Sequence, residues 1–253
     1  MFKEIVIAIQ SYARAHRFIQ KNKLWKWILV PGIVYTILFI ISMYFFGKTA
    51  NTFIDFIMSV SGLGNWLHET RSGTIGFLVT LSGIVLWIVQ MLFYFSLFKY
   101  TWLIIGSPVF SYLSEKTDQI LNGREKSFNK TQWLKDILRG ISIAIRNALW
   151  QTVYLIAIFI LSLIPIAGIF TILLALIVEC YYYGFSMLDY SCERKKWSAS
   201  KSIFYIGNNK GLAIGNGLVF YAMQCIPILG WVVAPAYAVI AAELSMQPEK
   251  ENI

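Results

Sequence analysis

The chain contains one short pattern twice, and each copy interrupts a long apolar stretch at its midpoint. The sequence reads Ile-Pro-Ile-Ala-Gly at residues 164–168 and Ile-Pro-Ile-Leu-Gly at residues 226–230. Proline disrupts a continuing helix, and glycine accepts the backbone angles of a turn. Each unit is therefore predicted to be a helical hairpin with two apolar arms, a design that some transporters repeat around a site inside the bilayer. The predicted tips are formed by Pro165, Gly168, Pro227 and Gly230.

Composition and charge indicate a membrane protein and argue against other classes. Hydrophobic residues make up 57% of the chain, charged residues 14%, and the mean hydropathy is +0.61. The net charge of +9 is also typical of nucleic-acid-binding proteins. Here, however, the cations lie between apolar runs, as in the inner loops of membrane proteins, so no nucleic-acid partner is expected. The sequence has no phosphate-binding glycine loop, nucleophile elbow or zinc spacing, so neither an enzyme, a cofactor nor a metal site is expected.

Two further apolar runs are long enough to cross a bilayer as single helices. Residues 27–46 would span about 30 Å, and the early Pro31-Gly32 either kinks this helix or marks its start. Residues 74–105 contain one charge and would span about 48 Å, so this helix tilts or its last turns leave the bilayer. Lys99 near its end is interpreted as a lysine that reaches the interface. The predicted fold class is all-α: a polytopic membrane protein with two long transmembrane helices plus two proline–glycine-tipped hairpins.

The basic segments give the chain an orientation. Residues 106–147 have seven cations against four acids, and residues 189–210 have five against two. With the basic residues 1–26, these segments are assigned to the cytoplasm by the positive-inside rule. Both termini would then be cytoplasmic, and the hairpins at 144–188 and 211–244 would enter from that side. All 253 residues are predicted to form one integral membrane domain.

Three details of this organisation can be compared with a structure. Residues 1–26 are predicted to form an amphipathic helix on the cytoplasmic surface. Ser107-Pro108 is predicted to start a new helix, with serine as the cap and proline at the first helical position. The arms of the second hairpin, about 24 Å each, favour partial penetration of the bilayer, whereas the first hairpin fits either partial or full penetration. The apolar positions expected on one face of the first helix are Phe2, Ile5, Ile9, Tyr12, Ala13 and His16.

Three segments, in this order, resemble the CysZ family of bacterial sulfate permeases and the related etoposide-induced-protein domain of eukaryotes. They are Gly-Ser-Pro-Val-Phe at 106–110 followed by Leu113 and Glu115, Asp189-Tyr190 with Lys201 after it, and the pattern at 226–230 with Ala234-Pro235. The order of apolar segments is also similar over essentially the whole chain. The resemblance implies a homo-oligomeric inner-membrane protein that moves sulfate inward for cysteine synthesis.

The chain departs from this family at one element. Family members commonly have a glycine-leucine-arginine sequence before the first membrane helix, which the resemblance associates with sulfate binding. Here the aligned residues are Lys23-Leu24-Trp25-Lys26. A lysine can contact an oxyanion, but it lacks the planar two-pronged fit of arginine. Specificity for sulfate is therefore less firmly implied than the fold.

Several residues have the chemistry to bind or guide an oxyanion. Lys23 and Lys26 supply positive charge, and a helix start at Gly106-Ser107 would supply unpaired amides. The alternative is that the lysines are ordinary anchors at the inner face and that Ser107 is only a cap. Two acids are candidates for a proton or ion path, Glu179 and Glu115. Glu179 could equally lie where its arm reaches the interface, and Glu115 could form an ion pair with a cytoplasmic lysine or arginine.

Two other functions remain open at this stage. A non-transporting membrane scaffold of the same fold would bind partner proteins and no solute. A permease for a different oxyanion or small solute would agree with the missing arginine. For sulfate itself, inward movement against a negative interior suggests coupling to protons or removal by rapid consumption.

Overall fold

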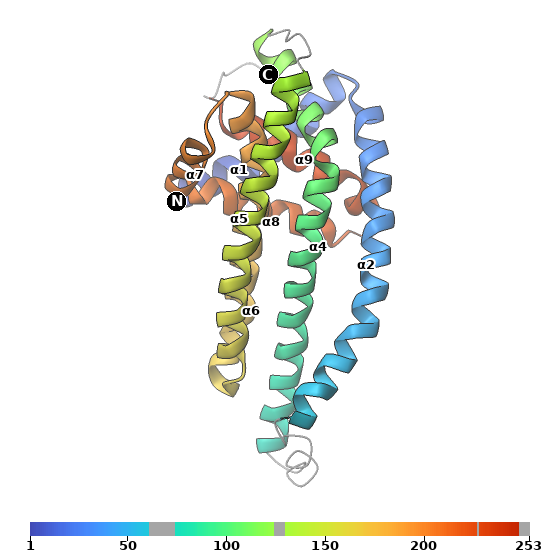
Figure 1. The fold of residues 1–253 in the computed structure, drawn as a ribbon, viewed down its shortest axis with the longest axis vertical. Coiled ribbons are helices and arrows are strands. Elements are labelled where there is room, and N and C mark those ends of the chain that lie inside the picture. Colours follow the sequence, from blue (N-terminus) through green and yellow to red (C-terminus); the bar gives the residue numbers. More distant parts are fainter. Residues whose placement is uncertain (61–73, 124–129, 227, 248–253) are drawn as a thin grey trace.

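The computed structural model describes residues 1–60, 74–123, 130–226 and 228–247, and every element in these ranges is an α-helix (Figure 1). Pro227 therefore lies outside the described residues. The helices are α1 (Phe2–Lys21), α2 (Trp25–Val60), α4 (Thr74–Asn122), α5 (Lys130–Ser162), α6 (Pro165–Arg194), α7 (Ala199–Asn208), α8 (Lys210–Gln224) and α9 (Leu229–Ser245).

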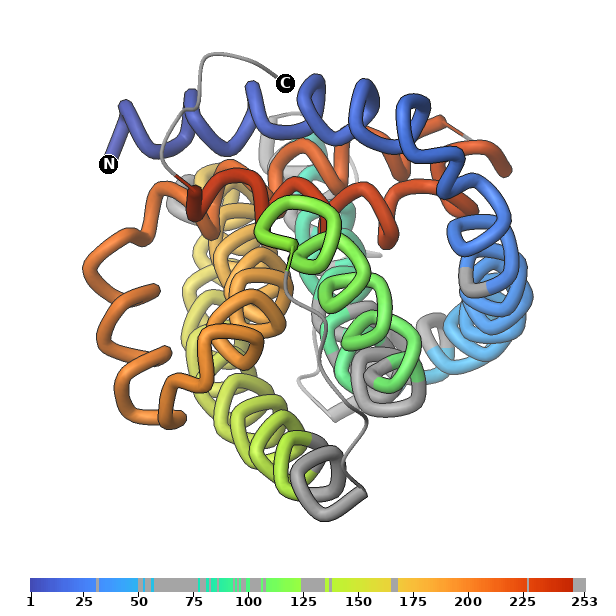
Figure 2. The backbone as a smooth tube through the Cα atoms, turned by 90° about the horizontal axis from the view of Figure 1, so that it is seen from above, coloured from blue at the N-terminus to red at the C-terminus, as the bar shows by residue number. Residues whose placement is uncertain are grey.

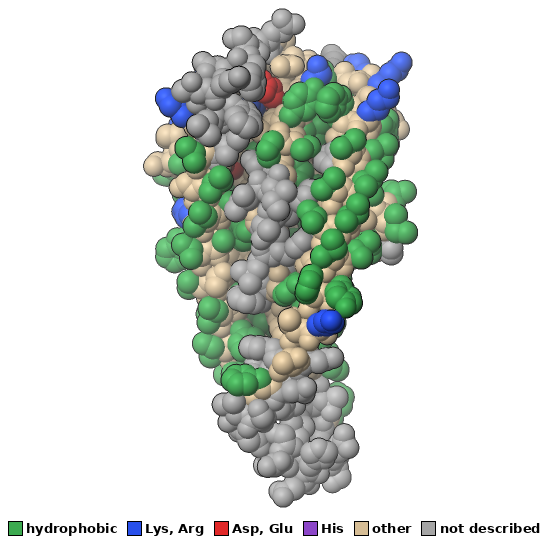
Figure 3. Space-filling model, turned by 45° about the vertical axis from the view of Figure 1, so that its right-hand side comes forward, with side chains coloured by type: hydrophobic (Ala, Val, Ile, Leu, Met, Phe, Trp, Pro, Cys, Tyr) green, Lys and Arg blue, Asp and Glu red, His purple; other side chains and the backbone are tan. Residues whose placement is uncertain are grey.

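The helices fall into two sets with different directions. Helices α2, α4, α5 and α6 run along the long axis, whereas α1, α8 and α9 lie across them near one end (Figures 1 and 2). Within the described ranges, three segments are long and apolar enough to cross a membrane: Trp25–Thr49, Leu138–Ser162 and Gly168–Arg194. Hydrophobic side chains cover the flanks of the long helices, and most Lys and Arg in this view lie toward the end with the crosswise helices (Figure 3). This is the architecture of an all-α polytopic membrane protein.

Helix α4 does not break where the sequence suggested. It has 49 residues, about 73 Å, and continues through Ser107 and Pro108 to Asn122. The predicted new helix start is wrong: Pro108 lies inside α4, where it removes one backbone hydrogen bond without ending the helix. Gly106 is buried, and a methyl group there would lie 2.7 Å from the Phe110 ring. A continuous helix has no set of unpaired amides at Ser107, so the predicted anion contact there loses its structural basis.

The first hairpin consists of α5 and α6, which are longer than the predicted 144–188. Only two residues separate the helices, and Pro165 occupies the first turn of α6 after an extended Ile164. The Gly168 amide donates to the Ile164 carbonyl over 2.7 Å, and a methyl group on Gly168 would lie 2.8 Å from the Ser162 carbonyl oxygen. The tip is tight because its proline begins the second arm and its glycine lets the first arm approach closely.

The second hairpin is shorter and lies across the long helices. Helices α8 and α9 have 15 and 17 residues, about 22 and 26 Å. The left-handed backbone at the tip belongs to Ile228, with φ +63°, and not to the predicted glycine. Gly230 lies instead in the first turn of α9, where a methyl group would overlap the carbonyl oxygen of Met223.

Helix α8 packs unusually close to α6 because small residues face each other. A methyl group on Gly217 would overlap the backbone carbonyl of Cys180, and one on Gly184 would overlap that of Ala213. Small residues allow this kind of backbone approach between membrane helices. Tyr183 of α6 stacks on Phe220 of α8, with ring centroids 3.6 Å apart. The α6–α8 crossing therefore fixes which side chains of the two helices meet.

Helix α1 packs against α8 and α9, and its buried face differs from the predicted one. Of the expected apolar positions only Tyr12 is buried, whereas Phe2, Ile9, Ala13 and His16 are exposed. The Tyr12 hydroxyl donates to the Asn216 carbonyl over 2.8 Å, and burial raises the pKa of this phenol well above its usual value. The residues that α1 buries are Ala8, Ser11, Tyr12, Ala15, Phe18 and Ile19.

We expect Gly217→Ala to destabilise the protein. The new methyl group meets rigid backbone of α6, so the helices must separate, at a cost of about 1–3 kcal/mol. Thermal unfolding of the detergent-purified protein would measure the loss. Gly207→Ala in α7 is the matched control, since a methyl group there has nothing within 4 Å. Equal melting temperatures for the two variants would contradict the close α6–α8 packing.

Candidate functional site

The carboxylate of Glu179 lies at the centre of a buried polar cluster. Its side chain is in α6 and its residue is fully buried. Oε2 accepts hydrogen bonds from Lys99 Nζ at 2.9 Å and from the Tyr221 hydroxyl at 2.8 Å. Oε1 accepts from Gln151 Nε2 at 2.5 Å. Three donors from three helices, α4, α5 and α8, therefore converge on one carboxylate.

Lys99 takes part in this cluster and does not reach the interface, so its predicted snorkelling is wrong. It is only 6% exposed, and its Nζ also donates to Gln151 Oε1 at 2.8 Å. The Tyr100 hydroxyl donates to the same Gln151 oxygen at 2.7 Å. We call Lys99, Tyr100, Gln151, Glu179 and Tyr221 the Glu179 cluster.

The Glu179 cluster is expensive to build, which points to a function. Removing two opposite charges from water costs several kcal/mol per ion, and well-packed apolar residues often serve stability equally well. Ionisable residues within transmembrane segments usually mark substrate, ion or proton routes. The Glu179 side chain is buried and bonded by residues of three other helices, so it faces protein and not solvent or lipid.

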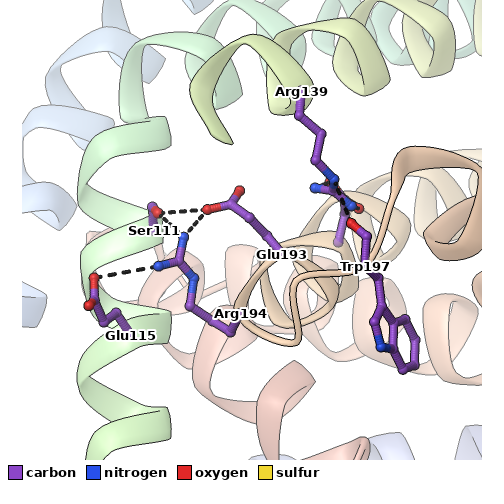
Figure 4. Close-up of polar contacts among 7 residues, drawn as sticks. Ser111, Glu115, Arg139, Glu193, Arg194 and Trp197 are labelled. Atoms are coloured by element: carbon purple, nitrogen blue, oxygen red, sulfur yellow. Dashed lines mark hydrogen bonds and ion pairs between the residues drawn. The ribbon is translucent and has the colours of Figure 1, made fainter. Parts of the chain in front are cut away.

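A second polar cluster links the C-terminal end of α6 to α4 (Figure 4). Arg194 lies 3.4 Å from a carboxylate oxygen of Glu115 and donates to the Ser111 hydroxyl over 2.7 Å. It also pairs with Glu193, which in turn accepts from Ser111. Glu115 thus makes the kind of arginine contact that a structural role requires.

A third group of contacts ties α5 to α6 and to the segment before α7. Arg139 makes a two-pronged pair with Asp189, at 2.8 and 3.2 Å. Its Nε also donates to the Trp197 carbonyl over 3.1 Å (Figure 4). Lys201 and Lys195 approach the Trp197 ring, 4.7 and 5.4 Å from its centroid. Asp189 is therefore buried in an ion pair at the end of its arm.

The predicted anion-binding lysines occupy a different place. Lys23 and Lys26 are exposed at the junction of α1 and α2, on either side of the buried Leu24. Lys23 has φ +54°, in the left-handed region that favours glycine. The lysines are accessible to a solute at this junction and take no part in the Glu179 cluster.

Sequence reasoning missed three of the five residues of the Glu179 cluster and misread a fourth. Tyr100, Gln151 and Tyr221 had no distinguishing pattern. Lys99 did have one, because it is the single charge among 32 apolar residues. A lone cation and a lone acid in separate apolar segments indicate an ion pair, since the attraction between the two charges offsets the cost of removing each from water.

Comparisons with known proteins agree with one another. The family model described as sulfate transporter CysZ/etoposide-induced protein 2.4 matches residues 11–235. Proteins named sulfate transporter CysZ are similar: that of Pseudomonas syringae pv. tomato is 25% identical over 56% of this chain and 56% of its own length. That of Pseudomonas fluorescens is 26% identical over 62% and 65%, and that of Pseudomonas paraeruginosa 22% over 90% and 89%. The chain thus spans less than two thirds of the first two relatives and most of the third.

We expect Asp189→Asn to lower stability by about 3 kcal/mol, because Arg139 then remains partly buried without a counter-charge. Unfolding of the purified protein in detergent would detect this. Replacing both partners, as Arg139→Met with Asp189→Leu, should recover most of the loss. A single variant as stable as the parent would refute the importance of this pair.

Proposed function

Because the chain belongs to the sulfate transporter CysZ/etoposide-induced protein 2.4 family, we propose that it is a bacterial inner-membrane permease that imports sulfate or a related oxyanion. In this role it would supply sulfur assimilation and cysteine synthesis. The observation that best supports transport is the Glu179 cluster, where a lysine is held inside the helix bundle. A doubly charged anion cannot cross the hydrocarbon core without a positive partner along its route.

The cytoplasmic mouth of the route is assigned to the junction of α1 and α2. Lys23 and Lys26 are exposed there and can attract an anion. We propose that both termini face the cytoplasm and that the α8–α9 hairpin, which is short and lies across the long helices, enters the bilayer only partly. Irregular backbone at such a depth needs protein or water around it, which favours a homo-oligomer.

Energetics favours a coupled mechanism. With a negative interior, importing two negative charges costs about 4.6 kcal/mol per 100 mV. At about 1.4 kcal/mol per tenfold, passive equilibrium would keep internal sulfate roughly a thousandfold below the external level. Protons moving with the anion would offset this cost, and Glu179 is the proposed carrier because its carboxylate is buried among the helices.

One observation favours a second candidate, a permease for a different oxyanion or small solute. The stretch Lys23-Leu24-Trp25-Lys26 has lysines but no arginine, and a lysine recognises an oxyanion less selectively. Thermal unfolding in sulfate, sulfite, phosphate and chloride separates these possibilities. A melting temperature that rises only with sulfate-like ions supports the sulfate permease. No rise with any anion would favour a scaffold that binds no solute.

Purified protein in liposomes should take up labelled sulfate, and an inward proton gradient should accelerate this uptake. The reason is that proton entry neutralises part of the imported charge. The measurement compares initial rates with and without the gradient at a clamped membrane potential. Rates that ignore the gradient would remove the coupled version, and absent uptake would overturn the permease.

Replacing both mouth lysines, as Lys23→Gln with Lys26→Gln, should raise the sulfate concentration at half-maximal uptake by about tenfold. Each exposed cation adds local attraction for the anion, and this attraction is screened by salt. Uptake by the parent protein should therefore weaken with ionic strength more than uptake by the variant. Lys3→Gln, an exposed cation on α1, is the control. A variant with parental uptake would show that these lysines are ordinary anchors.

A further inference from the structure

The three hydrogen-bond donors around Glu179 form a site that would suit any oxyanion. Lys99 Nζ, Gln151 Nε2 and the Tyr221 hydroxyl all point at the two carboxylate oxygens, at 2.5 to 2.9 Å. Carboxylates and sulfate are recognised by the same convergent N–H and O–H donors. In this structure the site is therefore filled by the chain's own carboxylate.

Asn147 supplies an unpartnered donor on the same side of α5. It precedes Gln151 by one helical turn, so the two side chains share a face. Asn147 is fully buried, and within the described residues its Nδ2 has no hydrogen-bond partner, while its Oδ1 accepts from Arg146. A buried donor without an acceptor costs about 1–3 kcal/mol, and an anion bound beside Gln151 would supply the missing acceptor.

The charge around the site also suits a dianion once the Glu179 carboxylate has left Lys99, Gln151 and Tyr221. Lys99 contributes one positive charge directly. Arg146 donates to the Oδ1 of Asn147 at 3.0 Å, so a second positive charge lies about one helical turn from Gln151. Two positive charges match the two negative charges of sulfate. While Glu179 occupies the site, its negative charge cancels the positive charge of Lys99.

We propose that Glu179 is a tethered competitor, whose carboxylate occupies the oxyanion site among Lys99, Gln151 and Tyr221 until the transported anion displaces it. This inference rests on the proposed permease function and names the site at which the anion binds inside the bundle. The displaced glutamate leaves its three donors to the anion, and Asn147 becomes a fourth. The site is therefore never left as an unpaired buried lysine.

The groups that face Glu179 come from the helices packed around it. Helix α6 itself adds the Cys180 thiol, which follows Glu179 in the chain. Among the titratable groups of the other helices, Lys99 of α4 and Tyr221 of α8 donate directly to the Glu179 carboxylate, and Tyr100 of α4 is linked to it through Gln151. Lys99 is thus the cation paired with Glu179.

The test measures sulfate binding to the full-length protein in detergent, through the rise of its melting temperature with sulfate concentration. Glu179→Gln removes the competing charge, so sulfate should bind about tenfold tighter than to the parent. In the parent, sulfate binds only to the fraction of molecules whose site is free of the carboxylate, and this lowers the apparent affinity. Glu179→Asp keeps the charge but shortens its reach, and should give an intermediate gain. In Lys99→Met the sulfate effect should disappear.

Asp189→Asn is the matched control, since it also removes a buried carboxylate from an ion pair, the one with Arg139. Equal sulfate tightening in Asp189→Asn and Glu179→Gln would overturn the proposal, because any unpaired buried cation would then behave in this way. Unchanged sulfate affinity in both Glu179 variants, with normal uptake by the parent in liposomes, would also overturn it and leave the permease intact. Tight binding to Glu179→Gln without uptake by the parent would support the site and reject the permease.

Discussion

The close contact of α8 with α6 is the constraint on which the rest of the structure depends. Gly217 and Gly184 have no side chain at the two points where backbone meets backbone. Association of helices in a membrane relies on packing of this kind, because lipid is as apolar as the side chains it would replace. The contact brings Tyr221 to Glu179 and completes the ring of donors. Glycine is a poor helix former, but Gly217 of α8 and Gly184 of α6 are the reason that these two helices can approach so closely.

The ionised side chains of the bundle are distributed by depth and by partner. Glu179 and Lys99 meet in its interior, while Arg194 and Arg139 pair with acids at the end of α6. The ion pairs of Arg139 and Arg194 connect helices that already pack against each other, as structural ion pairs do. The interior pair is different, because both Lys99 and Glu179 are buried and the Glu179 carboxylate accepts hydrogen bonds from three donors. This contrast favours a structural role for Glu115 and is the reason why a transport role is proposed for Glu179.

Sequence alone predicted the helical class, the long spans and the positions of both hairpin turns. These features follow from runs of apolar residues and from proline and glycine, whose effects are local. The faces of α1 and the continuity of α4 were beyond its reach, because both depend on neighbours. Tyr12 is buried by α8, and Pro108 is accommodated within a helix that other helices support. The site was half visible for the same reason: Glu179 stood out as a charge, but Gln151 and Tyr221 acquire meaning only when the fold brings them to it.

The unbroken α4 is a single strut between two charged regions. Lys99 and Glu115 are sixteen residues apart on it, about 24 Å along the axis. A rotation or slide of this helix that withdraws Lys99 from its carboxylate also moves Glu115 relative to Arg194. Pro108 lies between them, where one backbone hydrogen bond is missing, so bending of the strut concentrates at that position. A change in what Lys99 binds inside the bundle is thereby coupled, through α4, to the ion pair of Glu115 with Arg194.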